Sequence, residues 1–433
     1  MIDTYLKQFD ASASNGGGAG PPWLTALRRE AIEAFRGTGF PSAKDEEWRF
    51  TPVAPITRVD FSAAASPANV SLADLDPYLF GHPEWPRLVF VNGRFAPALS
   101  AGSVEDGALL PLSAAISLHP ARVEEHLGKH LPSSATPFTN LNTALAKDGV
   151  FLRVGAGSSD SRPVHLLFVA TPEAENAGMH PRSLIVVEPG ARVQVVESYL
   201  SLDGRAKYWT NPVVEISVGE GAWVEHSRIQ RESEAAFHTG FTQVTQGRAC
   251  HYRSFSLSIG GAIARHDLRT RLNAPDTEAL LYGLYIGNRD QLIDNHTVIN
   301  HDQPHCRSWE VYKGILDDRA HGVFNGKIFV TPEAQKTDAK QTNRVLLLSD
   351  NAKIDTKPQL EIFADDVKCT HGATIGQLDP MWSFYLRSRG IPPDVAHQML
   401  VAAFAAEVLE EVASEPVRVA LGRVVQERLD RVA

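Results

Sequence analysis

The middle of the chain, from about residue 183 onward, alternates between apolar and polar positions. In "SLIVVEPGARVQVVESYLS" and again in "PVVEISVGEGAWVEHSRIQ", two extended runs flank a short corner that contains Gly and Ala. In the second of these runs Val214, Ile216 and Val218 face one way, and Glu215 and Ser217 face the other. This period of two predicts β-strands, and "GRACHYRSFSLS" and "DTEALLYGLYI" follow the same plan.

The corners of these units recur about every 30 residues. We place four of them at alanines 191, 222, 249 and 279, with gaps of 31, 27 and 30, and two later ones at alanines 320 and 352, with a gap of 32. Repeated strand–corner–strand units without helical crossovers predict coils that stack into a β-solenoid, which buries its core only when several coils are present. A β-sandwich with long strands is the alternative that the pattern leaves open.

The start of the chain has a helical pattern instead. The run "PPWLTALRREAIEAFRGTG" places apolar residues at helical spacing, with Pro22 near the predicted start and Gly37 at the predicted end. The segment "KDEEWRFTP" closes this helical arm. The preceding "SASNGGGAG" has the composition of a flexible linker, and no Lys-Ser or Lys-Thr follows it as a phosphate-binding loop would require.

The end of the chain is also helical by pattern. "IPPDVAHQMLVAAFAAEVLEEV" predicts a helix whose apolar stripe comprises Val395, Met399, Ala402, Ala406 and Leu409. "SEPVRVALGRVVQERLDRVA" predicts a second helix, capped by Ser414. The apolar surface of this pair exceeds what one neighbour would cover, so packing on the core and docking of another protein both stay open.

These patterns divide the chain into four regions, with helix expected mainly in the first fifty and the last forty-odd residues. They are an N-terminal helical arm (1–60), a mixed region that leads into the core (61–175), a β-rich core (176–385) and a C-terminal helical domain (386–433).

Composition narrows the class of protein. The 433 residues are 43% hydrophobic and 21% charged, which favours a folded chain with a sizeable core. The net charge of −9 and the lack of a basic run argue against nucleic acid as a partner. Three cysteines do not form a disulfide framework, and we find neither a secretory signal nor a membrane-spanning stretch. We therefore expect a cytoplasmic protein that does not interact with membranes.

The segment "KCTHGATIG" places a thiol and an imidazole two residues apart on a predicted strand. Residues i and i+2 of a strand face the same way, so Cys369 and His371 lie side by side, and Val367 shares their face. The apolar neighbour predicts that the pair is at least partly buried, in the core or in a protein interface. Two donors do not complete the usual set of four around zinc or iron. A packed core pair and a site completed by a second chain or a substrate both stay open.

Other candidate residues carry weaker signals. His296, His301, His305 and Cys306 lie close together in "NHTVINHDQPHCRSW", but their spacing matches no zinc motif, so turn and ladder roles are favoured over metal binding. Cys250 is predicted to be a small buried residue at a corner. The pair Asp365 and Asp366 could serve a polysaccharide lyase on a β-solenoid, although a sharp turn is the favoured role.

Several long segments resemble one known family. "VYKGILDDRAHGVFNGKIFV", "AQKTDAKQTNRVLLLSDNAKIDTKPQLEIFADDVKCTHGATIGQLD" and "FYLRSRGI" resemble the SufB/SufD family of iron–sulfur cluster assembly proteins, and "KCTHGATIG" is similar to the SufD version. The likeness runs strongly from about residue 290 to 412 and more weakly over most of the chain. It implies a mainly β fold with a right-handed parallel β-helix core, an N-terminal helical arm and a C-terminal helical domain.

The resemblance also implies partners and a role. SufD pairs with SufB through the β-helix, and its C-terminal domain docks the SufC ATPase. His371 matches the SufD histidine that is proposed to hold a nascent iron–sulfur cluster with a SufB cysteine, and Cys369 matches the cysteine beside it. The chain would then be a scaffold for clusters that pass to apo-proteins, and not an enzyme. Binding of a flavin to the complex stays open.

Two other classes remain alternatives to this interpretation. A carbohydrate-active enzyme on a β-solenoid would need an acidic catalytic groove. A purely structural homodimer would leave His371 dispensable.

Overall fold

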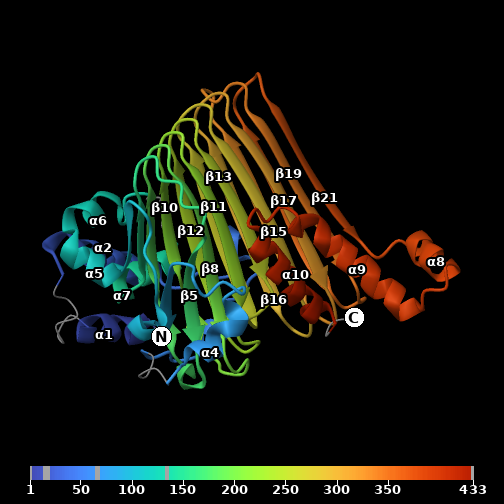
Figure 1. The fold of residues 1–433 in the computed structure, drawn as a ribbon, viewed down its shortest axis with the longest axis horizontal. Coiled ribbons are helices and arrows are strands. Elements are labelled where there is room, and N and C mark those ends of the chain that lie inside the picture. Colours follow the sequence, from blue (N-terminus) through green and yellow to red (C-terminus); the bar gives the residue numbers. More distant parts are fainter. Residues whose placement is uncertain (1, 13–19, 64–68, 132–135, 431–433) are drawn as a thin grey trace.

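The computed structural model describes residues 2–12, 20–63, 69–131 and 136–430, so most of the predicted linker "SASNGGGAG" lies outside the described residues. Its centre is a parallel β-solenoid of about eight turns, built from two sheets that face each other (Figure 1). Helices flank the solenoid on the N-terminal and C-terminal sides. The mainly β architecture predicted from the sequence is confirmed, and the β-sandwich alternative is wrong.

The first sheet has ten strands, and consecutive turns add neighbouring strands along it. In spatial order they are β2 (Arg94–Phe95), β1 (Arg87–Val91), β5 (Val164–Ala170), β8 (Arg192–Ser201), β11 (Trp223–Arg231), β13 (His251–Ser258), β15 (Glu278–Gly287), β17 (Arg307–Leu316), β19 (Asp338–Leu347) and β21 (Lys368–Gly376). The parallel pairing begins with β1 and β5, within the segment 61–175 for which the sequence predicted only mixed structure.

The second sheet has eleven strands. Its main path is β20 (Lys353–Ile362), β18 (His321–Val330), β16 (Leu292–His301), β14 (Ile263–Leu272), β12 (Phe237–Gln246), β10 (Val213–Val218), β7 (Arg182–Val187), β4 (Val150–Val154) and β3 (Gly107–Pro111). Off this path, β9 (Trp209–Thr210) pairs with β12, and β6 (Gly178–Met179) pairs with β9. From β4 and β5 onward, and apart from the short strands β6 and β9, each turn of the solenoid contributes one strand to each sheet.

The corner positions differ in part from the prediction. Ala191 and Ala222 precede β8 and β11 in register, and the next residue of that row is Cys250, which is buried, and not Ala249, which is exposed. Ala279 is the second residue of β15, and alanines 320 and 352 precede strands of the second sheet. The repeat length was right because one turn takes about 30 residues, but the six alanines do not share one position.

Apolar rows fill the interior between the two sheets. Val193, Val224, Tyr252 and Ala279 occupy the same register position on four consecutive strands of the first sheet, and all are buried. Full burial of a side chain such as Val193 stabilises the fold by about 1.5–3 kcal/mol. Stacking equivalent residues thus gives each turn its share of a continuous core.

Helices cover the outer face of the early turns (Figure 1). They are α1 (Ile2–Ser12), α2 (Pro22–Thr38), the 3-10 turn η2 (Glu46–Trp48), α3 (Ala54–Thr57), α4 (Leu72–Leu75), η3 (Asp76–Tyr78), η4 (Pro97–Leu99), α5 (Leu112–Leu118), α6 (Pro120–His126), α7 (Pro137–Leu145) and η5 (Pro172–Ala174). The helices α4 to α7 lie in the region 61–175, so helix is less confined to the chain ends than the sequence predicted.

The start of the predicted arm helix is right and its end is shifted. α2 begins at Pro22 and ends at Thr38, with Gly39 at its C-cap in the left-handed region (φ 65°), so Gly37 lies inside the helix. Glu215, which was predicted to face away from Val214, does so, but it is buried because the N-terminal helices cover that face. There it pairs with Arg182 and accepts a hydrogen bond from the Gly128 backbone N–H.

The C-terminal helices are α8 (Pro380–Ser388), α9 (Pro393–Leu409) and α10 (Glu415–Leu429). α9 buries Val401, Ala405 and Val408 against residues of β15 and β17, so the buried face coincides with the predicted stripe only in part, at Leu409 and the partly buried Ala402. In that stripe Val395 and Met399 are exposed. α9 is apolar nearly all round, and periodicity alone therefore could not choose the buried side.

Two further findings concern these C-terminal helices. Ser414 precedes α10, but its side chain makes no capping hydrogen bond, contrary to the prediction. Lys313 of β17 is buried, and its ammonium donates to the Phe404 carbonyl and pairs with Glu407, which anchors α9 to the sheet. In the described ranges, no helix is long and apolar enough to cross a bilayer.

Candidate functional site

Cys369 and His371 lie on β21, the edge strand of the first sheet at the end of the solenoid farthest from the N-terminal helices (Figure 1). β21 pairs in parallel with β19, and Cys369 lies opposite Ala339 and His371 opposite Gln341. Ala339 and Gln341 are both buried in the interior. Residues in register share a face, so Cys369 and His371 continue an inward-facing row at a point where no further coil follows.

The two side chains differ in burial. Cys369 is partly buried and packs against the solenoid core, as predicted. Burial raises the pKa of its thiol, although a backbone hydrogen bond involving Ala339 opposes the shift. His371 is exposed because no neighbouring coil covers it, so the partial burial predicted for the pair is found within this chain only at Cys369. Cys369 thus belongs to the edge of the core, and His371 belongs to the exposed surface.

The end of the solenoid around this pair is formed by two edge strands and exposed apolar side chains. β20 and β21 are the edge strands of the two sheets, and an edge strand presents unpaired N–H and C=O groups that another chain can pair with. The apolar side chains of Ile362, Phe363 and Ile375 are exposed at this end. We define the open end as strands β20 and β21 with the residues 363–367 between them.

The open end carries two candidate metal ligands of this chain, Cys369 and His371. Among the described residues, no group of three or more His, Cys, Asp or Glu side chains is arranged to bind a metal ion. Cys369 and His371 therefore supply at most two of the donors that an iron or zinc site requires. Any metal centre here needs ligands from a second molecule.

The turn before β21 carries Asp365 and Asp366. The backbone N–H of Asp366 donates to the Gln335 side chain, its carbonyl accepts from the Lys336 N–H, and its carboxylate pairs with the Lys336 ammonium. These contacts fix a bend between β20 and β21, in agreement with the turn role predicted from the sequence.

The second cluster of candidate residues is dispersed by the fold. His301 is buried and bonds to the Ser308 hydroxyl at 2.9 Å, while His305 adopts a positive φ in a turn. Cys306 is buried in the same corner row as Cys250 and donates to the Ala274 carbonyl. Their proximity in sequence therefore does not create a common site.

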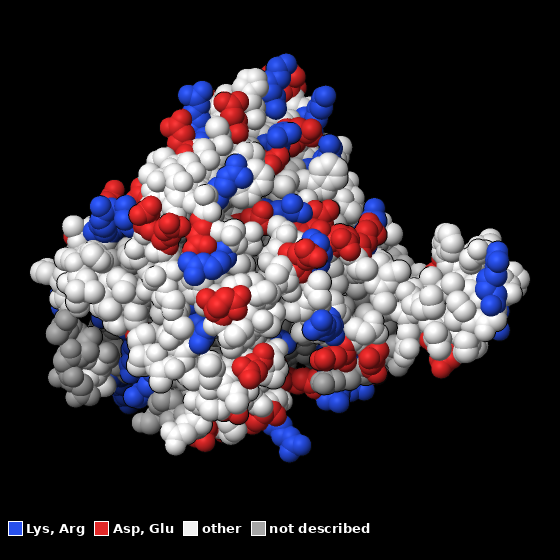
Figure 2. All heavy atoms as spheres, in the orientation of Figure 1, with Lys and Arg blue, Asp and Glu red and all other residues white. Residues whose placement is uncertain are grey.

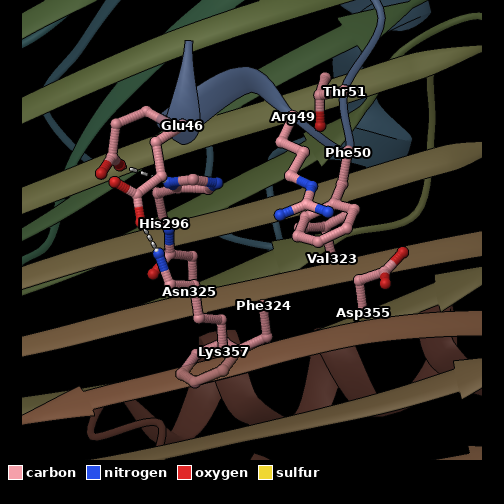
Figure 3. Close-up of a pocket in the computed structure, with 11 residues that line it drawn as sticks. Glu46, Arg49, Phe50, Thr51, His296, Val323, Phe324, Asn325, Asp355 and Lys357 are labelled. Carbon is pink, nitrogen blue, oxygen red and sulfur yellow. Dashed lines mark hydrogen bonds and ion pairs between the residues drawn. The ribbon is translucent and has the colours of Figure 1, made fainter. Parts of the chain in front are cut away.

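His296, the remaining member of that cluster, lines a cavity of about 140 Å³ between the N-terminal arm and the second sheet (Figure 3). Its ring nitrogens contact Asp294 at 3.0 Å and Glu47 at 3.2 Å. Burial and the nearby Arg265 work against protonation, but the two carboxylates outweigh them and raise the pKa of His296. The hydrogen bond with His296 is the main reason that the pKa of Glu47 is lowered to about 2.

This cavity joins the arm to the sheet. Glu46, Glu47, Arg49, Phe50 and Thr51 come from the arm, and the opposite wall includes His296, Asn325 and Lys357 from β16, β18 and β20 (Figure 3). Lys357 pairs with Glu46, and the Thr51 hydroxyl donates to Asp294. Acidic and basic groups neutralise one another here, so the arrangement holds the arm in place.

Sequence reasoning did not single out Gln341, Arg265 or Asp294. Arg265 and Asp294 lie on neighbouring strands in direct register, a relation that appears only once the turn length is known. Gln341 lies on the inward face of β19, and a polar amide at a position in register with core residues is the signal that could have identified it once the register was known.

A separate apolar surface lies on α8, which projects from the body of the molecule (Figures 1 and 2). Met381, Trp382, Phe384 and Tyr385 are all exposed on this short helix, which Asp379 caps through the Met381 backbone N–H. The sequence placed the apolar docking surface further along, in residues 391–412. In the structure α9 uses much of its apolar surface on the solenoid, and α8 carries the larger free patch.

Comparison with known proteins gives consistent matches. Residues 168–404 match the SufBD core domain of the SUF system for FeS cluster assembly, and residues 2–166 match the SufBD protein N-terminal region. An iron–sulfur cluster assembly SufBD family protein of Synechocystis is 35% identical over 398 residues, covering 90% of this chain and 87% of that protein. The iron–sulfur cluster assembly protein SufD of Escherichia coli is 32% identical over 391 residues, with 89% of each chain covered. SufD of Bacillus subtilis is 27% identical over 440 residues, covering 98% of this chain and 97% of its own.

Proposed function

Because the chain belongs to the SufBD family of the SUF iron–sulfur cluster assembly system, we propose that it is a SufD-type scaffold subunit that pairs with a SufB-type chain. The nascent iron–sulfur cluster forms between the two chains and then passes to apo-proteins. The cluster is cargo in this account, and this subunit contributes ligands and shape but no catalytic step of its own.

The open end is the observation that supports this proposal. It combines two unpaired sheet edges, exposed apolar side chains and an inward row that ends in Cys369 and His371. A partner solenoid that continues both sheets would satisfy the edge hydrogen bonds and cover His371. The same partner would supply the ligands that this chain lacks, so pairing and completion of the site become one event.

The two side chains contribute differently to the cargo. A neutral imidazole binds iron through a ring nitrogen, and His371 is exposed where the partner would lie. The thiolate form of cysteine is the iron ligand, and burial disfavours that form by raising the pKa of the Cys369 thiol. Cys369 therefore binds only if iron or a partner base removes its proton, and His371 is the stronger candidate ligand.

A SufC-type ATPase is the second partner that we propose, docked at the C-terminal helices. The exposed apolar residues of α8 and the free side of α9 at Val395 and Met399 form a patch that nothing in the described chain covers. The chain contains no phosphate-binding loop of its own, so ATP hydrolysis belongs to the partner.

Disrupting the open end tests the pairing. We expect Phe363→Asp, at a side chain that is 58% exposed, to abolish co-purification with a SufB-type partner and to lower the iron and acid-labile sulfide of the anaerobically purified complex. Leu118→Asp is the matched control because Leu118 is 65% exposed and lies on α5, away from the open end. Pairing unaffected by Phe363→Asp would contradict the proposal, as would a complex of two copies of this chain with no affinity for the partner.

A further inference from the structure

The row that ends in His371 becomes polar as it approaches the open end. Leu281, Glu310, Gln341 and His371 occupy one register position on β15, β17, β19 and β21. Leu281 is apolar and fully buried, as expected for a core row, but Glu310 and Gln341 are buried just as deeply. Buried polar groups cost stability unless they are hydrogen-bonded. The presence of two such groups on the two strands that precede the exposed His371 therefore needs a physical explanation.

Glu310 and Gln341 are bonded to each other but not fully satisfied. The side-chain N–H of Gln341 donates to Glu310 Oε2 at 2.7 Å. The other end of the amide, Gln341 Oε1, is buried and accepts no hydrogen bond from the described residues. The Glu310 contact therefore fixes one end of the amide and leaves its acceptor free.

The opposite sheet leaves room for the Gln341 side chain. At Gly326 on β18, an added Cβ would come within 2.2 Å of Gln341 Nε2, so any larger residue there would displace the amide. The space for the amide thus comes from a glycine on the facing wall.

We propose that Gln341 is a positioning residue for His371, whose ring N–H donates to the unpartnered Gln341 Oε1. Neighbouring strands lie about 4.8 Å apart, and rotation of the exposed imidazole brings its N–H within reach of the amide oxygen. The bond fixes the tautomer and the ring direction, so the other ring nitrogen presents its lone pair at the open end. Hydrogen bonds of this kind commonly orient a metal-binding histidine and raise its basicity.

The bond itself is a property of this chain, while its use in cluster assembly rests on the proposed function. We would label the histidines of the full-length chain with ¹⁵N and record long-range ¹H–¹⁵N spectra, with His371→Ala to assign the resonance. We expect one neutral tautomer of His371 to predominate in the wild type. Gln341→Met, which keeps the length of the side chain but removes the amide, should shift the tautomer ratio toward that of an unconstrained imidazole.

Two further variants keep the test decisive. Thr342→Val alters the neighbouring, outward-facing residue of β19 and should leave the tautomer ratio unchanged. If Gln341→Met does not fold, Gln341→Asn shortens the side chain by one methylene and should withdraw the oxygen from reach. A His371 tautomer ratio that is the same in the wild type and in the folded Gln341 variant would overturn the inference.

A second readout separates this inference from the proposed function. In the assembled complex, Gln341→Met should weaken iron binding about 10-fold, the lower end of the usual effect of such outer hydrogen bonds. If the tautomer shifts with Gln341→Met but His371→Ala leaves iron and sulfide unchanged, the hydrogen bond is correct and the proposed function is wrong. If His371→Ala removes the cluster but the tautomer ratio of His371 does not change in Gln341→Met, the proposed function stands and this inference fails.

Discussion

The guanidinium carbon of Arg265 lies 3.8 Å from the centroid of the Trp48 ring, and both side chains are buried. Trp48 belongs to the N-terminal arm and Arg265 to β14, so this contact joins the two parts of the chain. Arg265 also pairs with Asp267 and Asp294 and donates to the Glu47 carbonyl. The arm is therefore held by a buried cation that lies between an aromatic ring and carboxylates.

Loss of the Trp48 ring should detach the arm. We expect Trp48→Ala to cost about 3–5 kcal/mol, because it leaves a cavity and exposes one face of the Arg265 guanidinium. Thermal denaturation and limited proteolysis near residues 44–52 measure the effect. Trp309→Ala is the control, since Trp309 is 46% exposed whereas Trp48 is 4% exposed. Equal destabilisation by the two variants would contradict this role for Trp48.

Docking of the arm should weaken at alkaline pH. The pKa of His296 is raised in the folded chain. The stability that its protonated form gives to the docked arm is therefore fully present below the pKa of His296 in the unfolded chain, and it is lost as the pH rises through the pKa in the folded chain. Hydrogen exchange of residues 46–51 should therefore be faster at pH 8.5 than at pH 6 after correction for the intrinsic rate. His296→Gln should flatten this dependence, and His119→Gln, on an exposed helix end, should not. If the pH dependence of hydrogen exchange is the same in His296→Gln and in the wild type, docking of the arm does not depend on this histidine.

Glu310 should also make the stability of the fold depend on pH, and, as with His296, stability should fall as the pH rises. Burial raises its pKa from 4.5 to about 7, so its contribution to stability is greatest below about pH 4.5 and is lost as pH rises toward 7. At 1.36 kcal/mol per pKa unit, the loss is roughly 3 kcal/mol. Glu310→Gln keeps an oxygen to accept from Gln341 and should be more stable than the wild type at pH 8. A melting-temperature difference that does not change between pH 5 and pH 8 would contradict the assignment.

The α8 patch should be necessary for ATPase docking. We expect the double variant Trp382→Ala, Phe384→Ala to lose co-purification with a SufC-type ATPase while its melting temperature changes little, because both side chains are exposed. Truncation after Gly390 is a poorer test, since it would also uncover the sheet residues beneath α9. Leu118→Ala, a change at an equally exposed apolar residue, should leave docking intact. Wild-type ATPase binding by the double variant would exclude α8 as the contact.

Much of the fold followed from the sequence because a solenoid repeats one local rule. The alternation around Val214 and Ile216 identified strands, and the repeat length of about 30 residues identified coils. The pattern could not show which corner residues stack, since Ala249 and Cys250 are both small and only the register distinguishes them. The helices α5 and α6 were missed because they bury their apolar faces against the outer face of the sheet and have no side-chain N-cap.

The candidate site was only partly readable from the sequence. The i, i+2 spacing placed Cys369 and His371 on one face, but not at the last turn of the solenoid, which depends on where the repeats end. The environment of His371 was also hidden, because Gln341 and Glu310 precede it by about one and two turns of chain. Contacts between successive turns are set by register, and a single sequence shows them only after the fold is known.

The most direct test of the central claim is whether a nitrogen of this chain binds the cluster. The complex would be assembled anaerobically from ¹⁵N-histidine-labelled subunit and unlabelled partners, and the reduced cluster examined by pulsed electron paramagnetic resonance. We predict a strong ¹⁵N hyperfine coupling that disappears in His371→Ala and persists in Cys369→Ser if the thiol only packs. No ¹⁵N coupling in the wild type, or a coupling that survives His371→Ala, would contradict the account.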